Sequence, residues 1–259
     1  MPSGLNYSRA SRPHFQNASL FSKVLNPRSS IPALWLADLV ALFLPRRCAG
    51  CDGTLLRFEE CLCTTCLVDL PFTRFHEDPA NRVEQIFWGK VPLVAASALL
   101  QFSTTGMVQR ILHRMKYRQD LETGRHIGRL MGEALKGCVR FSDVDAVVAV
   151  PLHPRKQRQR GYNQSRLLVE GIMDVWPKED PLKALQRTAF TASQTKRGRL
   201  DRWTNVKEAF AVKDPEALRD RHVLLVDDVV TTGATIEGCV KALYTVEGVR
   251  VSLFTAACA

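Results

Sequence analysis

Short runs of mainly apolar residues recur along the C-terminal two thirds of the chain, and one of them, residues 223–226, is unbroken. Four of them predict strands of one sheet, and the unbroken run suits a parallel strand buried on both faces, because a strand with one solvated face would alternate apolar and polar positions. They occupy residues 94–102, 144–150, 223–226 and 249–255. Between them, apolar residues repeat every three to four positions, as in amphipathic helices. These helical segments are residues 106–117, 127–139, 167–175 and 236–246.

The alternation of buried strands and amphipathic helices predicts an α/β protein with an open, mainly parallel sheet flanked by helices. Residues 68–94 interrupt the pattern with three prolines and predict an irregular connection. Residues 185–210 are polar and rich in Arg and Lys, with an apolar residue at either end. A chain of 259 residues can hold one such domain and a small appendage.

The N-terminal part of the chain has a different composition. Residues 1–31 are polar, basic and rich in Ser, Asn and Pro, which predicts a disordered tail or translated sequence upstream of the true start. Residues 31–44 are apolar except for Asp38, too short for a membrane span, and predict an amphipathic helix that packs on the protein. We therefore expect no stable membrane insertion, a helix and cysteine module at 32–80, and the α/β domain at 81–259.

The segment after the 223–226 run combines two carboxylates with a loop of small residues and a helix. Asp227 and Asp228 lie where the strand is predicted to end. Free N–H groups of the loop and of the helix N-terminus favour an anion, and Gly233 lets the backbone approach it. The two carboxylates would repel a phosphate unless they faced other donors, such as vicinal ribose hydroxyls. The segment therefore predicts a sugar-phosphate site, and it lacks the lysine of a nucleotide-hydrolysing P-loop.

Eight cysteines are present, and four of them form two C-x-x-C knuckles. Cys48 with Cys51, and Cys63 with Cys66, can aim four thiolates at one ion in the tetrahedral geometry of structural zinc. Cys61 is a fifth candidate. A redox-active dithiol is the alternative, but a single knuckle would serve that chemistry. A metal site also implies a reducing compartment.

The charge balance favours anionic partners, since 36 Lys and Arg residues stand against 26 Asp and Glu residues. One basic cluster follows the 144–150 run, in a predicted loop at the C-terminal end of a parallel strand, where open α/β sheets bind ligands. Its members are Arg155, Lys156, Arg158 and Arg160. A second cluster is predicted on the outer face of the 106–117 helix, outside any small-molecule site. It consists of Arg110, Arg114, Lys116 and, just beyond, Arg118. The alternative to an anionic partner is that this basic surface only aids solubility.

Val223 to Thr235, VLLVDDVVTTGAT, resembles position by position the motif with which type I phosphoribosyltransferases bind 5-phosphoribosyl 1-diphosphate (PRPP). The chain also contains the two knuckles, PLHPRKQRQRGYNQS and TKRGRLDRWTNVKEAF. This combination, over roughly residues 35–259, is similar to the ComF family, bacterial proteins linked to natural competence and built on a phosphoribosyltransferase fold. The resemblance implies a type I phosphoribosyltransferase-like sheet with a small N-terminal zinc module of four cysteines.

The resemblance also implies roles for individual residues. Asp227 and Asp228 would be catalytic and hold the ribose hydroxyls, one of them through Mg²⁺. The PRPP loop would comprise Val229, Val230, Thr231, Thr232, Gly233, Ala234 and Thr235. The pyrophosphate would be bound by His153, Arg155, Lys156, Arg160, Lys196 and Arg199. The last two lie in the 185–210 segment, which resembles the flexible hood of this fold.

Two functions follow from the resemblance. The first is Mg²⁺-dependent transfer of ribose 5-phosphate from PRPP to a nitrogen acceptor, in a cytoplasmic protein linked to DNA uptake and natural transformation. The second is a non-catalytic protein that senses PRPP and handles single-stranded DNA, with Tyr117 and Trp203 as stacking platforms beside the basic helix. Proteins of the competence machinery are the expected partners. The sequence does not indicate an acceptor pocket.

Overall fold

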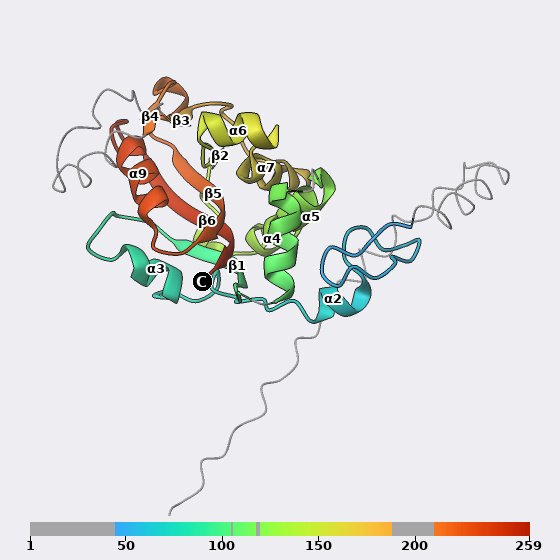
Figure 1. Ribbon diagram of the computed structural model, residues 1–259. Coiled ribbons are helices and arrows are strands. Elements are labelled where there is room, and N and C mark those ends of the chain that lie inside the picture. The colour runs from blue at the N-terminus through green and yellow to red at the C-terminus, as the bar shows by residue number, and fades with distance from the viewer. Residues whose placement is uncertain (1–44, 105, 118–119, 188–209) are drawn as a thin grey trace, which may run out of the picture. The chain divides into compact units, whose positions relative to one another are not determined.

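A four-stranded parallel sheet forms the centre of the computed structural model, which describes residues 45–104, 106–117, 120–187 and 210–259 (Figure 1). The strand order is β1-β6-β5-β2, and all three pairings are parallel. The strands are β1 (Ala96–Gln101), β2 (Ala146–Ala149), β5 (His222–Val230) and β6 (Arg250–Cys258). They correspond to the four predicted runs, so the predicted α/β class with a parallel sheet is confirmed.

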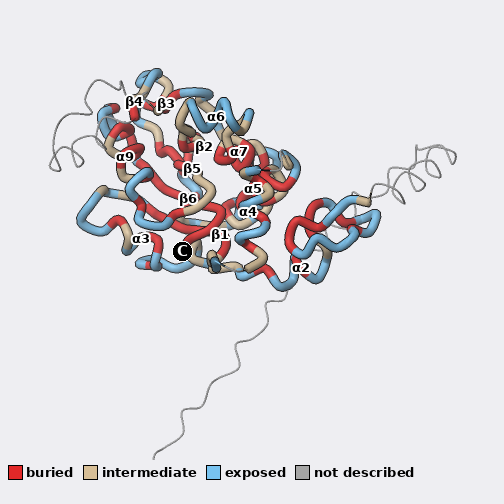
Figure 2. The backbone as a smooth tube through the Cα atoms, in the orientation of Figure 1, coloured by how far each residue is buried: buried red, intermediate tan, exposed pale blue. Residues whose placement is uncertain are grey.

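Helices cover both faces of the sheet, because the strands are apolar on both. Leu224 and Val226 of β5 face one core, and Val223 and Leu225 face the other. The first face is covered by α4 (Met107–Tyr117), α5 (Leu121–Lys136) and α7 (Gln164–Val175). The second is covered by α3 (Arg82–Phe87) and α9 (Ala234–Leu243). Figure 2 shows the strands as a buried layer between these helices.

The remaining elements are short and lie around this central layer. They are α2 (Thr64–Val68), α6 (Pro154–Arg160), β3 (Leu185–Arg187), β4 (Phe210–Val212) and 3-10 turns at Val139–Phe141 and Glu216–Leu218. Strands β3 and β4 pair antiparallel, so the two ends of the predicted hood segment are joined at its base. The hood itself, including Lys196, Arg199 and Trp203, lies outside the described residues.

Helices α5 and α7 approach each other to backbone contact. A Cβ atom added to Gly128 of α5 would lie 2.3 Å from the Leu168 carbonyl oxygen of α7. One added to Gly171 of α7 would lie 2.1 Å from the Arg125 carbonyl oxygen of α5. Real Cβ atoms do not come so close, so only glycine fits at these two positions. The closeness of this pair fixes where α7 begins, which matters for the site described below.

Three predictions about local structure were wrong. The strand does not end before the aspartates: β5 continues to Val230, because Asp227 and Val229 stay in register with Thr255 and Ala257 of β6. The basic residues after β2 form helix α6 rather than a loop. Pro154 stands in its first turn, where no N–H is needed, and the His153 ring accepts a hydrogen bond from the Arg155 N–H at 3.2 Å.

The third error concerns residues 68–94, which were expected to be irregular but contain helix α3. Its cap is Asn81, whose side-chain oxygen accepts from the N–H groups of Val83 and Glu84. The helix has six residues, too few to show a clear apolar period. The expected helix at 31–44 lies outside the described residues. Within the described part of the chain, no helix is long and apolar enough to cross a membrane.

Candidate functional site

The two aspartates lie near the C-terminal end of β5, and the first turn of α7 points at one of them. The Ser165 hydroxyl donates to Asp227 Oδ1 at 2.9 Å, and the backbone N–H of Asp228 donates to the same oxygen at 2.9 Å. Asn163 caps α7 by accepting from the Ser165 N–H, and its own amide donates to the Val150 carbonyl at 2.9 Å. The end of β2 therefore positions the start of α7, which positions the hydroxyl on Asp227.

The surroundings of Asp227 disfavour the charged form of its carboxyl. Burial raises the pKa of its carboxyl to about 7, and the neighbouring charge of Asp228 adds to this rise. The Asp228 N–H, the Ser165 hydroxyl and the Lys116 ammonium oppose this shift but do not cancel it. The donors and the cation around this partly buried carboxyl offset only part of the cost of ionising it. The carboxyl is therefore suited to accept hydrogen bonds from a ligand.

Asp228 is paired with a cation from the other side of the site. Lys116 Nζ lies 2.8 Å from Asp228 Oδ2, and it comes from the last turn of α4. Two further contacts hold this turn. The Tyr162 hydroxyl donates to the Met115 carbonyl at 2.6 Å, and the Arg160 guanidinium lies 5.3 Å from the Tyr117 ring centroid. Lys116 therefore contacts the acidic pair, a placement that the basic cluster predicted on α4 did not indicate.

The small-residue loop connects β5 to the start of α9. Thr231 and Thr232 are exposed, and the first residues of α9, Ala234 and Thr235, are exposed as well. Gly233 has φ +79°, and a Cβ atom there would lie 2.7 Å from Phe87 Cε1 of α3. Among the described residues no side chain caps α9, so its first N–H groups are available to an anion.

The two valines of the predicted PRPP loop belong to the core instead of the loop. Val230 is buried, and Val229 packs against the core on the opposite face of the sheet. Both are residues of β5, so they can shape the site only through their backbone.

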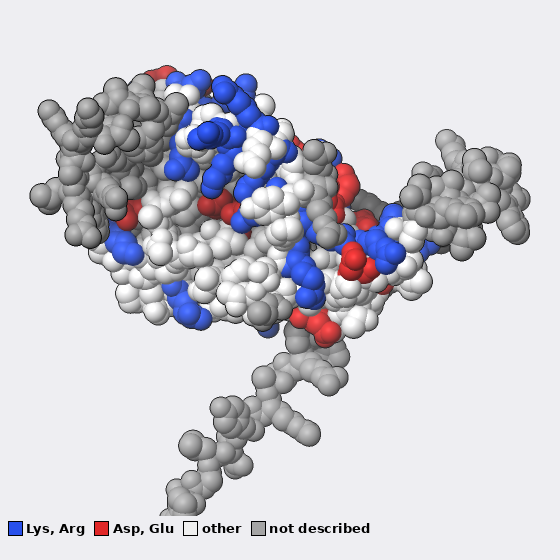
Figure 3. Space-filling view, in the orientation of Figure 1, with Lys and Arg blue, Asp and Glu red and all other residues white. Residues whose placement is uncertain are grey.

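The predicted pyrophosphate residues that can be described lie on α6 or at its start. Arg155 and Lys156 are exposed, and Lys and Arg side chains gather over α6 in Figure 3. Arg160 is less exposed and donates to Gln164 at 2.7 Å, which turns it toward α7. His153 serves as the cap of α6. The structure thus places these residues next to the start of α7, and Lys196 and Arg199 lie outside the described residues.

Two other arginines of the predicted basic cluster on α4 are also engaged, whereas Arg118 lies outside the described residues. Arg110 Nε donates to the Gly50 carbonyl, and Arg114 pairs with Asp52 and donates to the Arg47 carbonyl at 3.2 Å. Both arginines therefore hold the first cysteine knuckle against α4. They also line a cavity of about 360 Å³, to which the acidic pair of β5 does not contribute.

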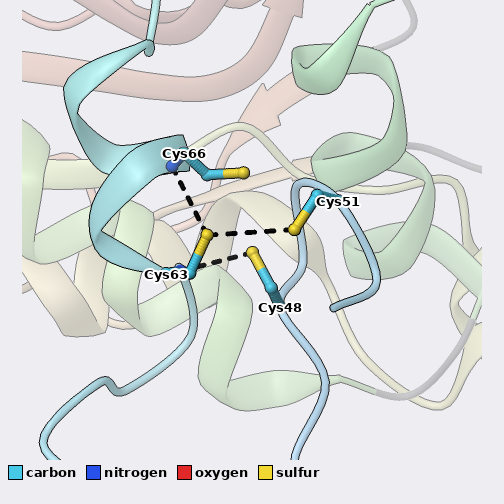
Figure 4. Close-up of side chains that lie close together, drawn as sticks. All are labelled: Cys48, Cys51, Cys63 and Cys66. Atoms are coloured by element: carbon cyan, nitrogen blue, oxygen red, sulfur yellow. Dashed lines mark hydrogen bonds between the residues drawn. The ribbon is translucent and has the colours of Figure 1, made fainter. Parts of the chain in front are cut away.

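Four thiols meet beside α4 (Figure 4). The Sγ atoms of Cys48, Cys51, Cys63 and Cys66 all lie within 4.8 Å of one another, and those of Cys51 and Cys63 are 3.8 Å apart. Zinc–sulfur bonds of about 2.3 Å in a tetrahedron place neighbouring sulfurs about 3.8 Å apart. The four residues therefore fit one zinc ion, and with four protein ligands the ion would be structural.

The environments of the individual thiols differ, and position separates the four from Cys61, since burial raises the pKa of Cys66 as well. Burial opposes ionisation of Cys48, but N–H groups of Cys63, Cys51 and Gly50 outweigh it and lower its pKa to about 7. Burial raises the pKa of Cys61 to about 12, with Asp120 adding to the shift. Cys61 is not part of the four-thiol cluster. The ambiguity left by the sequence is thus resolved in favour of Cys63 and Cys66 as the second pair.

The chain is similar to several known proteins, although no family model matches it. It is 30% identical over 214 residues to the DNA utilization protein YhgH of Escherichia coli strain K12, covering 80% of this chain and 88% of that protein. It is 26% identical over 200 residues to Competence protein F of Haemophilus influenzae, covering 76% and 83%. Competence protein ComFC of Streptococcus pneumoniae is 28% identical over 196 residues, covering 76% and 80%.

Among solved structures, the allosteric regulatory enzyme of purine biosynthesis matches with a TM-score of 0.38 and 13% identity, over 55% of this chain and 30% of that chain. This likeness is too low to support an argument. The sheet, its flanking helices and the cysteine cluster define an α/β protein with an open parallel sheet and an N-terminal cysteine module. Within that class, the chain belongs to the ComF family of competence and DNA-utilization proteins.

The cysteine cluster predicts about one zinc ion per purified chain by elemental analysis. Cys48→Ser removes a buried thiolate from the shell and should lower zinc affinity by at least tenfold, with a matching loss of stability. Cys61→Ser is the control, because Cys61 lies in the same module outside the cluster, and it should retain zinc. Equal zinc content in the two variants would contradict the assignment.

The environment of Asp227 predicts a pH-dependent gain in stability for Asp227→Asn. Between the ordinary pKa of 3.8 and about 7, the folded protein holds a proton that the unfolded chain has lost. The cost of ionising Asp227 therefore grows through this range and is complete above pH 7. In Mg²⁺-free urea titrations, the variant should be more stable by about 2–4 kcal/mol at pH 8 and by less than half of that at pH 5.

The control for this experiment is Asp69→Asn, at an exposed position in the cysteine module. It should leave the free energy of unfolding within about 0.5 kcal/mol at both pH values. A gain for Asp227→Asn that is the same at pH 5 and pH 8 would show that ionisation is not its cause.

Proposed function

We propose that this protein binds PRPP together with Mg²⁺ at the C-terminal end of β5. The carrying observation is the position of the two aspartates next to the uncapped start of α9. Ligands of open α/β sheets lie outside the carboxyl ends of the strands. A ligand there would meet carboxylate acceptors on one side and N–H donors on the other, as a sugar phosphate requires.

Different residues would bind different parts of PRPP. The N–H groups at the start of α9 and the Thr231, Thr232 and Thr235 hydroxyls would hold the 5-phosphate. Asp227 and Asp228 would accept from the ribose hydroxyls. Their oxygens also suit Mg²⁺, which when bound would neutralise charge on the diphosphate. Arg155, Lys156 and Arg160 would supply cations for the same group.

Whether binding leads to transfer depends on an acceptor. In a phosphoribosyltransferase, the bound groups would orient PRPP, stabilise the departing pyrophosphate and exclude water. Incubation with PRPP, Mg²⁺ and candidate nitrogen bases, with pyrophosphate release as the readout, would separate transfer from binding alone. Pyrophosphate release that depends on a base would establish the enzyme, and binding without release would favour a PRPP sensor.

The double variant Asp227→Asn with Asp228→Asn tests the binding site. It keeps the volume but removes the charge that hydroxyl donors and Mg²⁺ require, so calorimetry should show PRPP affinity lower by tenfold or more. The control replaces two exposed carboxylates, Asp69 and Asp78, by Asn and should bind like the wild type. Unchanged affinity in the Asp227 and Asp228 variant would refute this site.

A second candidate function is binding of single-stranded DNA, and the exposed cations of α6 favour it. Arg155, Lys156 and Arg158 project from one short helix, which is more charge than a single diphosphate needs. Relatives named for DNA utilization and competence are consistent with this role. The engaged residues of α4 are less suited to DNA than the sequence indicated, since Arg110, Arg114 and Lys116 have partners within the protein.

If α6 binds DNA, affinity should fall log-linearly with salt because neutralised phosphates release counterions. Changing Arg155, Lys156 and Arg158 to Ser should reduce the slope of that dependence by roughly two units for an oligothymidylate. The control changes three exposed lysines, Lys90, Lys136 and Lys213, to Ser. A slope that falls equally in both triple variants would indicate nonspecific attraction, and no binding at low salt would remove the hypothesis.

A further inference from the structure

Lys116 is a cation in the candidate site that the sequence motifs do not assign. It lies far along the chain from the basic residues of α6 and from Asp228, with which it pairs at 2.8 Å. Its side chain is 26% exposed and that of Asp228 is 17% exposed, so both are partly shielded from solvent but open to a ligand. A pair in this setting is stronger than a fully exposed one and can still exchange partners.

The backbone that carries Lys116 is held by contacts of its two neighbours. Met115 is fully buried, and its carbonyl accepts from Tyr162. Tyr117 lies beneath Arg160. Within the described part of the chain, Asp228 is the one carboxylate with which the Lys116 ammonium forms an ion pair. A lysine has a four-carbon stem and three donors, so the ammonium can turn from one acceptor to another without moving α4.

A bound PRPP would change what surrounds this ammonium. Asp228 would accept hydrogen bonds from ribose hydroxyls, and the diphosphate would bring several negative charges to the same edge of the sheet. The ammonium would then have a stronger acceptor in a phosphate oxygen than in a carboxylate already shared with the sugar. Arg160 contacts the ring of Tyr117, the next residue along α4, so its cation lies at the same end of α4 as Lys116.

We propose that Lys116 is a specificity-determining residue, which pairs with Asp228 in the free protein and donates to the diphosphate when PRPP is bound. The inference rests on the proposed function and adds to it a selection between ligands. A ligand that carries the diphosphate offers the Lys116 ammonium a phosphate oxygen in place of Asp228. Ribose 5-phosphate lacks that group, so it must compete with Lys116 for Asp228. The residue therefore favours PRPP over the sugar phosphate that remains after the diphosphate is lost.

The test compares three ligands on Lys116→Gln, each measured by calorimetry with Mg²⁺. Affinity for PRPP should fall by about tenfold or more, because a charged hydrogen bond is lost. Affinity for pyrophosphate should fall in the same direction. Affinity for ribose 5-phosphate should stay within about twofold or increase, since its competitor is gone. Lys116→Arg should restore most of the preference for PRPP, and Lys90→Gln, at an exposed site on another element, should leave all three ligands unchanged.

The outcomes separate this inference from the function on which it rests. Wild-type protein that binds no PRPP would overturn both. Wild-type protein that binds PRPP, with a Lys116→Gln variant that keeps the full preference for PRPP, would overturn the role of Lys116 alone. Equal loss of all three ligands would make Lys116 a structural counter-ion of Asp228 and also overturn it. Thermal unfolding of each variant checks the fold, and Lys116→Met, which also removes the charge, replaces Lys116→Gln if that variant is unstable.

Discussion

The structure around the candidate site depends on the cost of placing two neighbouring carboxylates near the end of one strand. Asp227 is partly buried and lies beside the charge of Asp228, so its carboxyl resists ionisation. The fold meets this cost with donors from separate elements: a hydroxyl from α7, a backbone N–H of β5 and an ammonium from α4. These donors offset only part of the cost of ionising Asp227. Donors of a bound ligand would offset more of it.

This demand explains the arrangement of the helices on that face of the sheet. Helix α7 must begin close to Asp227, and its position is set by contact with α5 at Gly128 and Gly171. Helix α4 must end close to Asp228, and its last turn is held by Tyr162 from the segment between α6 and α7. Packing that looks remote from chemistry therefore determines where two polar side chains stand.

The sequence predicted those features that are encoded by residues close together in the chain. The four strands, the acidic pair with its loop, and the two knuckles each occupy one short segment, so their patterns could be recognised. Lys116 with Asp228, and Ser165 with Asp227, join segments far apart in the sequence, and no local pattern indicates them. Helix α6 was missed because it is polar all round and has no apolar period.

Helix α4 connects the cysteine module with the acidic pair of β5. Arg110 and Arg114 hold the first knuckle through Gly50 and Asp52, and the next turn of the same helix carries Lys116. A helix of this length is stiff, so one element spans the distance between the thiols and the aspartates. The cysteine module thus contacts the same helix that supplies a cation to the acidic pair. A change in the cysteine module can therefore reach Lys116 through α4, whose opposite face is anchored in the core.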